Sequence, residues 1–150
     1  MKRLKKTLAV ISLLGVLLLN GAAFAEVHVV EMLNKGDEGA MVFKPAIVYA
    51  QAGDTIHFKA TTKGHNVVSF KDMLPEGVTP FKSKFSKDFE LVVEKDGTYG
   101  YFCQPHLPIG MVGLIVVGDD IDLSTVQLGK KVKGKALKRF NKYLADASKK

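Results

Sequence analysis

The sequence from residue 26 to residue 119 is a series of short strand-like segments separated by turns. Segments rich in β-branched and aromatic residues, such as TIHFKA at 55–60 and MVGLIVVG at 111–118, are bounded by turns that contain Gly, Asp or Asn. Pro45 interrupts the segment AMVFKPAIVYA at 40–50, as is typical of a bend or an edge strand. About eight such segments, with no helical periodicity between them, predict an all-β fold, an antiparallel sandwich or barrel, rather than an α/β fold.

The C-terminal tail has a different periodicity. In GKALKRFNKYLADASKK, at 134–150, four apolar residues recur on one face of a predicted helix: Leu137, Phe140, Leu144 and Ala147. A shorter helix is predicted near 123–128, with Asp122 as its cap. A basic amphipathic helix can lie on a membrane, but this apolar face is narrow and has one bulky anchor, Phe140. The pattern therefore favours packing against the sandwich.

Residues 1–25 have the three parts of a secretory signal peptide. Basic residues precede an apolar run from Leu8 to Leu19, and the small-x-small sequence Ala23-Phe24-Ala25 follows. The run is shorter than the ~20 apolar residues that a membrane-spanning helix needs. We therefore expect cleavage after Ala25 and export of the mature chain, Glu26 to Lys150, into an oxidising compartment.

The composition and length of the mature chain indicate one small domain with a mild positive charge. Removing the four basic residues of the signal peptide lowers the net charge from +7 to +3, because 18 basic residues then face 15 acidic ones. This mild excess gives little support to nucleic-acid binding. The remaining 125 of the 150 residues suit one domain with one core, and no internal repeat or linker divides them.

Cys103 is the only cysteine, so it cannot form a disulfide within the chain. It ends the strand segment TYGYFC, and His106 and Met111 follow at a C-x2-H-x4-M spacing. One loop thus presents a thiolate, an imidazole and a thioether, which are soft or borderline ligands. A His and Cys set with a weak axial Met is the donor set of a blue-copper electron-transfer site.

Such a site needs a second histidine from elsewhere in the fold, and three are available. His65 is the strongest candidate because it stands in KGHN at the start of a strand, where a loop end can direct its ring towards another loop. His28 and His57 lie inside strand segments between apolar residues, where a partly exposed structural histidine is the ordinary interpretation.

Other interpretations of the cysteine loop are weaker. Cys103 taken alone would be a small buried hydrophobe, and Met111 a core methionine. A closed zinc site takes four strong ligands, and methionine is a poor fourth. A cysteine nucleophile paired with His106 would need a third, orienting group, which the loop lacks. An immunoglobulin-type strand around Tyr101 would require a second Cys and a Trp, and the chain has neither.

Several stretches resemble the pseudoazurins, a family of bacterial type 1 copper proteins of the cupredoxin class. They are MLNKG at 32–36, GAMVFKP at 39–45, TKGHN at 62–66, KDMLPEG with FKSK within 71–84, and CQPHLPIGM at 103–111. The resemblance implies a Greek-key, cupredoxin-like β-sandwich of about eight strands over 26–120, after a signal peptide at 1–25. It also implies a helical extension with two helices at 121–150, which separates the chain from plastocyanin and amicyanin.

The same resemblance implies one type 1 copper ion bound by His65, Cys103, His106 and Met111. The implied function is the transfer of single electrons in the periplasm, without catalysis, by a monomer. The family's partners are redox proteins: copper nitrite reductase, a denitrification enzyme, as acceptor and c-type cytochromes on the other side. Neither nucleic acid nor, after signal cleavage, a membrane is expected as a partner. The alternative is a periplasmic copper carrier, which would favour exposed, exchangeable ligands.

Further residues follow from the resemblance. Asn66 is expected to tie the two ligand loops together and to donate towards the Cys103 sulfur, while Pro105 removes a backbone donor from the loop. Met41 matches a family position near a ligand histidine, although taken alone it is more typical of a core methionine. The implied docking surface is an apolar loop with a basic rim: Leu107, Pro108 and Ile109, with Lys35, Lys63 and Lys82. The chain departs from its relatives at 107–109, where many have Tyr-Ala-Met, and at Phe102, where several have lysine.

Overall fold

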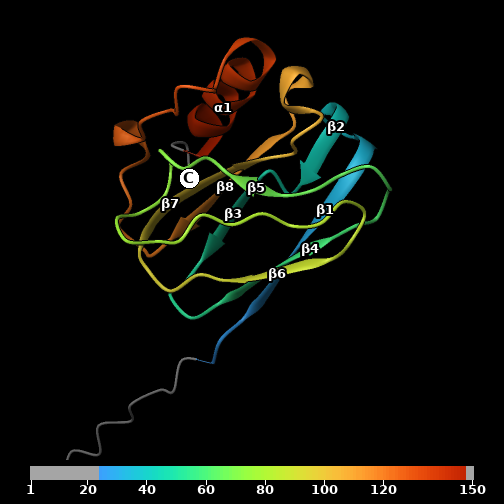
Figure 1. The fold of residues 1–150 in the computed structure, drawn as a ribbon. Coiled ribbons are helices and arrows are strands. Elements are labelled where there is room, and N and C mark those ends of the chain that lie inside the picture. The colour runs from blue at the N-terminus through green and yellow to red at the C-terminus, as the bar shows by residue number, and fades with distance from the viewer. Residues whose placement is uncertain (1–23, 148–150) are drawn as a thin grey trace, which may run out of the picture.

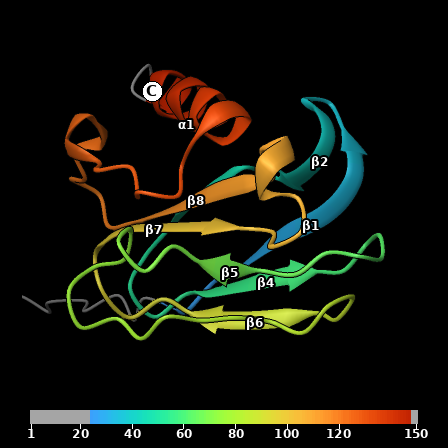
Figure 2. The same cartoon turned by 45° about the horizontal axis from the view of Figure 1, so that its top comes forward.

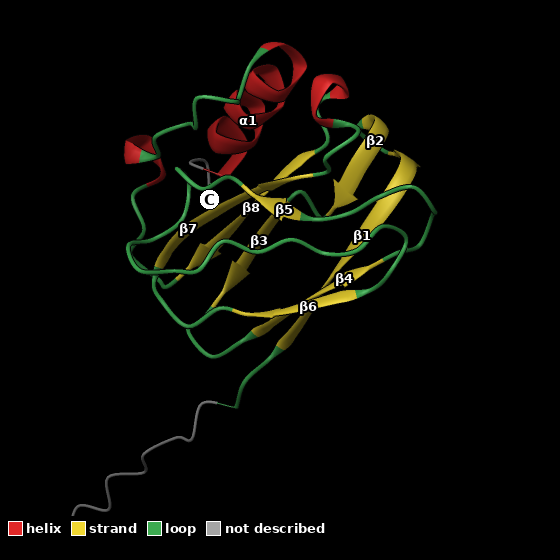
Figure 3. Ribbon diagram, viewed as in Figure 1, coloured by secondary structure: helices red, strands yellow, loops and turns green. Residues whose placement is uncertain are grey.

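A computed structural model describes residues 24–147, which form two four-stranded sheets and one α-helix (Figures 1 and 3). The predicted signal peptide lies outside the described residues apart from Phe24 and Ala25. The strands are β1 (Val27–Gly36), β2 (Gly39–Lys44), β3 (Ile47–Ala50), β4 (Thr55–Lys59), β5 (Val68–Ser69), β6 (Phe89–Val92), β7 (Gly97–Phe102) and β8 (Val112–Val117). This arrangement confirms the predicted all-β sandwich.

The two sheets are mixed rather than wholly antiparallel. Their strand orders are β2-β1-β4-β6 and β3-β8-β7-β5, and the pairs β1·β4 and β3·β8 are parallel. The prediction of an antiparallel sandwich was therefore wrong for these two strand pairs. At Pro45 the chain leaves the first sheet for the second, so β3 continues the direction of β2. The turn at 51–54 then reverses the chain, and β4 returns beside β1 in the same direction.

The main core lies between the sheets and draws residues from both. The rings of Phe43 and Phe58 contact the Tyr101 ring edge to face, with centroids 4.9 and 5.0 Å away. Tyr101 covers Gly113 of the neighbouring strand so closely that a Cβ at Gly113 would come within 2.3 Å of the ring. Cys103 and Met111 belong to this same cluster and are fully buried, so two of the predicted ligands lie at one end of the core.

Helix α1 (Gly134–Ala147) lies over β8, on the outer face of the second sheet (Figure 2). Its buried face is formed by Ala136, Phe140 and Tyr143, whereas Leu137 is 38% exposed. The predicted face was thus correct at Phe140 and at Leu144, which packs against the same buried cluster, but wrong at Leu137, because the helix turns Tyr143 inward. The shorter helix is one 3-10 turn, η2 (Leu123–Thr125), and Asp122 caps it by accepting from the Ser124 N–H at 2.9 Å. No helix within residues 24–147 is long and apolar enough to cross a membrane.

The Asp54 side chain stabilises the turn between β3 and β4. Its carboxylate, 5% exposed as a residue, accepts from the backbone N–H groups of Gln51 and Glu26, both at 2.8 Å, and contacts His28 Nε2 at 2.9 Å. These hydrogen bonds, led by that from Gln51, lower the pKa of Asp54 to about 2.

Asp54→Asn is expected to destabilise the fold by about 2 kcal/mol at pH 7. The folded-state pKa is depressed, so the stabilisation is present above the unfolded value of about 3.9 and is lost as the pH falls towards about 2. Urea unfolding of the copper-free wild type and of the Asp54→Asn variant, between pH 7 and pH 2, measures this difference in the free energy of unfolding. A difference from wild type that stays constant over this range would contradict the charged interaction.

Candidate metal centre

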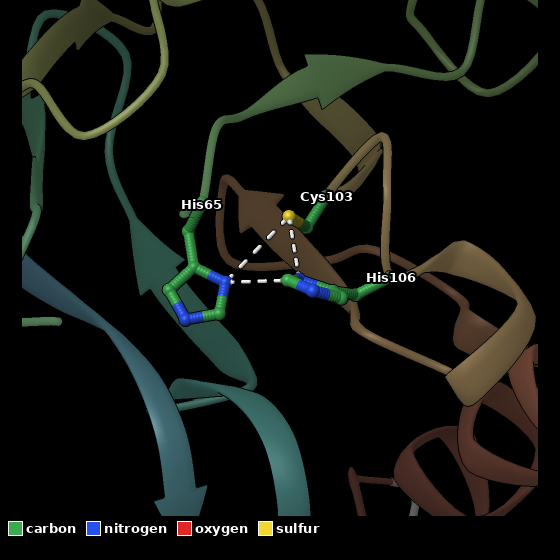
Figure 4. A group of neighbouring side chains, drawn as sticks. All are labelled: His65, Cys103 and His106. Atoms are coloured by element: carbon green, nitrogen blue, oxygen red, sulfur yellow. Dashed lines mark hydrogen bonds between the residues drawn. The ribbon is translucent and has the colours of Figure 1, made fainter. Parts of the chain in front are cut away.

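Three side chains from two loops converge at one end of the sandwich (Figure 4). His65 precedes β5, Cys103 follows β7, and His106 precedes the 3-10 turn η1 (Leu107–Ile109). One ligand atom from each residue lies within 4.8 Å of the other two. The structure thus brings together the histidine and the two loop residues that the sequence singled out.

The donor atoms form a small triangle. The Cys103 sulfur is 3.4 Å from His106 Nδ1 and 3.7 Å from His65 Nδ1, and the two nitrogens are 3.1 Å apart. Such separations match the edges of a coordination polyhedron with bonds of about 2.0 Å to nitrogen and about 2.3 Å to sulfur. Cys103 and His65 are fully buried, and His106 is partly exposed. The group therefore fits a soft or borderline metal ion closed off from water on all sides but one.

Asn34 fixes the orientation of His65. The Asn34 side-chain oxygen lies 2.8 Å from His65 Nε2. A carbonyl oxygen only accepts, so this contact places the imidazole proton on Nε2 and leaves the lone pair of Nδ1 directed at Cys103 and His106. Sequence reasoning missed this role: Asn34 lies within MLNKG, but its contact with His65 spans 31 positions and has no local signal.

Burial keeps the imidazole neutral. Burial lowers the pKa of His65, and the neighbouring His106 ring lowers it further because two charged rings would repel. Burial raises the pKa of the Cys103 thiol, while the backbone N–H groups of Asn66 and His106 lower it. A bound cation deprotonates a coordinating thiol and neutralises its charge. The arrangement thus favours a metal ion over a free buried thiolate.

The Asn66 side chain ties the two ligand loops together. Its oxygen accepts from the Gln104 backbone N–H at 2.9 Å, next to Cys103. The side-chain nitrogen is buried and makes no hydrogen bond within the described part of the chain. The predicted donation from Asn66 to Cys103 is made by the Asn66 backbone N–H, which lowers the pKa of the thiol, and not by this side-chain nitrogen.

Met111 closes the ligand loop onto Cys103. The Met111 backbone N–H donates to the His106 carbonyl at 3.1 Å, and its carbonyl accepts from the Cys103 N–H at 3.0 Å. The side chain is fully buried in the same core cluster as Cys103. Pro105 is exposed on this loop, and Met41 is partly buried at φ +53° against the same core. Axial ligation by Met111 stays a prediction.

His28 and His57 make contacts with carboxylates elsewhere. His28 pairs with Asp54, and His57 lies 3.1 Å from Glu90 and 3.3 Å from Asp88. Neither is part of the group around Cys103. These contacts fit the structural interpretation of both strand histidines.

The predicted docking residues lie at the surface. Pro108 and Ile109 are exposed and Leu107 is partly exposed, all three in η1 directly after His106. Exposed lysines stand at the three predicted positions: Lys35, Lys63 and Lys82. Their role in docking stays a prediction.

A β-sandwich with a buried His–Cys–His group at one end defines a copper protein of the cupredoxin class. The model of the copper binding proteins of the plastocyanin/azurin family matches residues 30–118. A pseudoazurin of Paracoccus pantotrophus is 46% identical over 134 residues, which cover 89% of this chain and 92% of the relative.

Solved structures agree with this match. The crystal structure of pseudoazurin from Methylobacterium extorquens AM1 has a TM-score of 0.71 at 40% identity, covering 81% of this chain and 98% of that one. Native pseudoazurin from Hyphomicrobium denitrificans gives 0.70 at 40% identity, covering 80% and 97%. The chain belongs to the plastocyanin/azurin family of copper-binding proteins and, within it, to the pseudoazurins. Membership confirms the predicted copper cofactor and makes the chain a cupredoxin electron-transfer protein.

Proposed function

We propose that this chain carries single electrons in the periplasm through one type 1 copper ion held by His65, Cys103 and His106, with Met111 as a weak axial ligand. The observation that carries the proposal is the buried triangle of one thiol and two Nδ1 atoms, with edges of 3.1 to 3.7 Å. The bound copper supplies a one-electron redox couple. The chain catalyses no reaction by itself.

The residues around the site would hold the same donor geometry in both oxidation states of a bound copper ion. Asn34 fixes the His65 ring, Asn66 holds the Cys103 loop, and the backbone bonds of Met111 close that loop. Fixed ligands and the exclusion of water reduce the rearrangement that accompanies electron transfer. His106 is the partly exposed member of the group, so we assign the electron's exit to its ring.

The proposed partners are redox proteins: copper nitrite reductase as acceptor and c-type cytochromes as donors. They would dock on the exposed apolar turn of Leu107, Pro108 and Ile109, with the basic rim guiding the encounter. The chain would act as a periplasmic monomer after cleavage of residues 1–25, with a cupredoxin sandwich at 26–120 and a helical extension at 121–150. A mass spectrum of the exported protein that begins at Glu26 would support this processing.

Addition of Cu(II) to the purified mature protein tests the function. We expect one equivalent to give an intense visible absorption that disappears on one-electron reduction and returns on oxidation. A colourless Cu(I) adduct that passes copper to a competing chelator, without any visible band in the oxidised state, would support the copper carrier instead.

Met111→Gln is expected to keep copper and to shift the reduction potential. A weak axial bond contributes less to affinity than to tuning of the potential. Voltammetry of the copper-loaded variant measures the shift, and the visible band reports that the metal is retained. A potential equal to that of the wild type would mean that Met111 is not the axial ligand.

A further inference from the structure

One guanidinium group of α1 joins two segments that border the copper site. Arg139 Nη1 donates to the Gly110 carbonyl at 2.8 Å and to the Met41 carbonyl at 2.6 Å, and Nη2 donates to the Ala40 carbonyl at 2.7 Å. Gly110 directly precedes Met111, and Ala40 and Met41 belong to β2. A single side chain, 29 positions from Gly110 and 98 from Met41, therefore connects the end of the ligand loop to the sandwich.

The local backbone is shaped to present these carbonyls. Gly110 ends η1 at φ +92°, and Met41 adopts φ +53°, a left-handed conformation that is uncommon for a residue other than glycine. The helix sits directly on the loop, because a Cβ at Gly110 would lie 3.1 Å from the Lys135 backbone. Such an unusual backbone persists where its surroundings hold it, and here the guanidinium contributes to that.

The peptide between Gly110 and Met111 is held at both ends. Its oxygen accepts from Arg139, and its N–H donates to the His106 carbonyl at 3.1 Å. A peptide unit is planar and rigid, so fixing both ends fixes the orientation of the whole unit. The next carbonyl, that of Met111, accepts from the Cys103 N–H at 3.0 Å. A shift of this peptide would therefore move Met111 relative to Cys103 and His106.

We propose that Arg139 is a positioning residue of the copper site, which fixes the Gly110–Met111 peptide and thereby the place of Met111 against Cys103 and the two histidines. This inference rests on the proposed function, because it assigns Arg139 a role in tuning that site. The planar fork of arginine suits the task, since it directs several N–H donors at fixed angles. A lysine ammonium keeps the charge but has no such fork.

Three variants of the copper-loaded protein separate positioning from charge: Arg139→Lys, Arg139→Gln and Lys138→Gln. Lys138 is the adjacent residue of α1 and carries the same charge, but it donates to none of the three carbonyls. We expect both Arg139 variants to change the reduction potential and the relative intensities of the visible bands. Amide exchange at the Met111 N–H should become about tenfold faster or more, as when hydrogen bonds to a charged group are lost. Lys138→Gln should resemble the wild type.

Two results would overturn the proposal. One is an Arg139→Lys protein with the spectrum, potential and Met111 exchange rate of the wild type. The other is an Arg139→Gln protein that differs from wild type no more than Lys138→Gln does, since charge alone would then explain the effect. A wild-type protein that forms no visible band contradicts the proposed function instead, and the Met111 exchange rates still report on the positioning.

If the Arg139 variants do not fold, a measurement on the wild-type protein tests the same proposal. In the reduced, diamagnetic copper form, nitrogen NMR should show distinct, slowly rotating Nη groups for Arg139, with couplings to the Gly110 and Met41 carbonyls across the hydrogen bonds. A freely rotating guanidinium without such couplings would overturn the proposal.

Discussion

Cys103→Ser is expected to abolish the intense visible absorption of the copper-loaded protein. The band requires a soft thiolate bound to copper, and a serine hydroxyl cannot supply one. The Cys103 sulfur lies 3.4 Å from His106 Nδ1 and 3.7 Å from His65 Nδ1. Another thiol cannot take over, because the chain has only one cysteine.

The fold should survive this substitution. The bonds that close the ligand loop, Cys103 N–H to the Met111 carbonyl and His106 N–H to the Cys103 carbonyl, are both backbone contacts and do not involve sulfur. Far-UV circular dichroism should therefore match that of the wild type while the visible band is absent.

A matched control is His57→Gln, which removes a histidine that faces Asp88 and Glu90 instead of the Cys103 group. It should keep the full band. Retention of the charge-transfer band by Cys103→Ser would refute the ligand assignment.

Local patterns were enough to predict the strands and the three side chains that the structure brings together, His65, Cys103 and His106. The C-x2-H-x4-M spacing lies within one loop, and three of the proposed ligands are at most eight positions apart, from Cys103 to Met111. His65 was identifiable because it stands at the start of a strand, unlike the two histidines inside strands. The sequence determined these features through short-range geometry.

Features that depend on long-range contacts were missed. The parallel pairing of β1 with β4 arises from a passage through the opposite sheet, which periodicity does not report. The face of α1 was ambiguous because Phe140 fits both the predicted set and the observed one with Tyr143. Asn34 and Arg139 are polar residues whose partners lie 31 and up to 99 positions away. Both act on the site from segments that carry no ligand.

Reversal of the rim charges is expected to slow electron transfer to an acidic partner. Lys35→Glu, Lys63→Glu and Lys82→Glu should each reduce the bimolecular rate, by about tenfold at low salt, since steering by local charge raises association rates by this order or more. The predicted mature chain has a net charge of only +3, so the effect must come from the local arrangement of lysines. The visible spectrum and the reduction potential should stay unchanged.

The decisive comparison is between the electron-transfer rates of wild type and variants over a series of ionic strengths. The Debye length falls from about 10 Å at 0.1 M to about 3 Å at 1 M, so stopped-flow rates of wild type and variants should converge at high salt. Lys95→Glu serves as the control, because Lys95 is exposed just before β7, whereas Cys103 follows the other end of that strand. The Lys95→Glu variant should slow electron transfer only slightly. Rates insensitive to salt and to the rim reversals would mean that docking is apolar, through Leu107, Pro108 and Ile109, and that the lysines contribute only solvated charge.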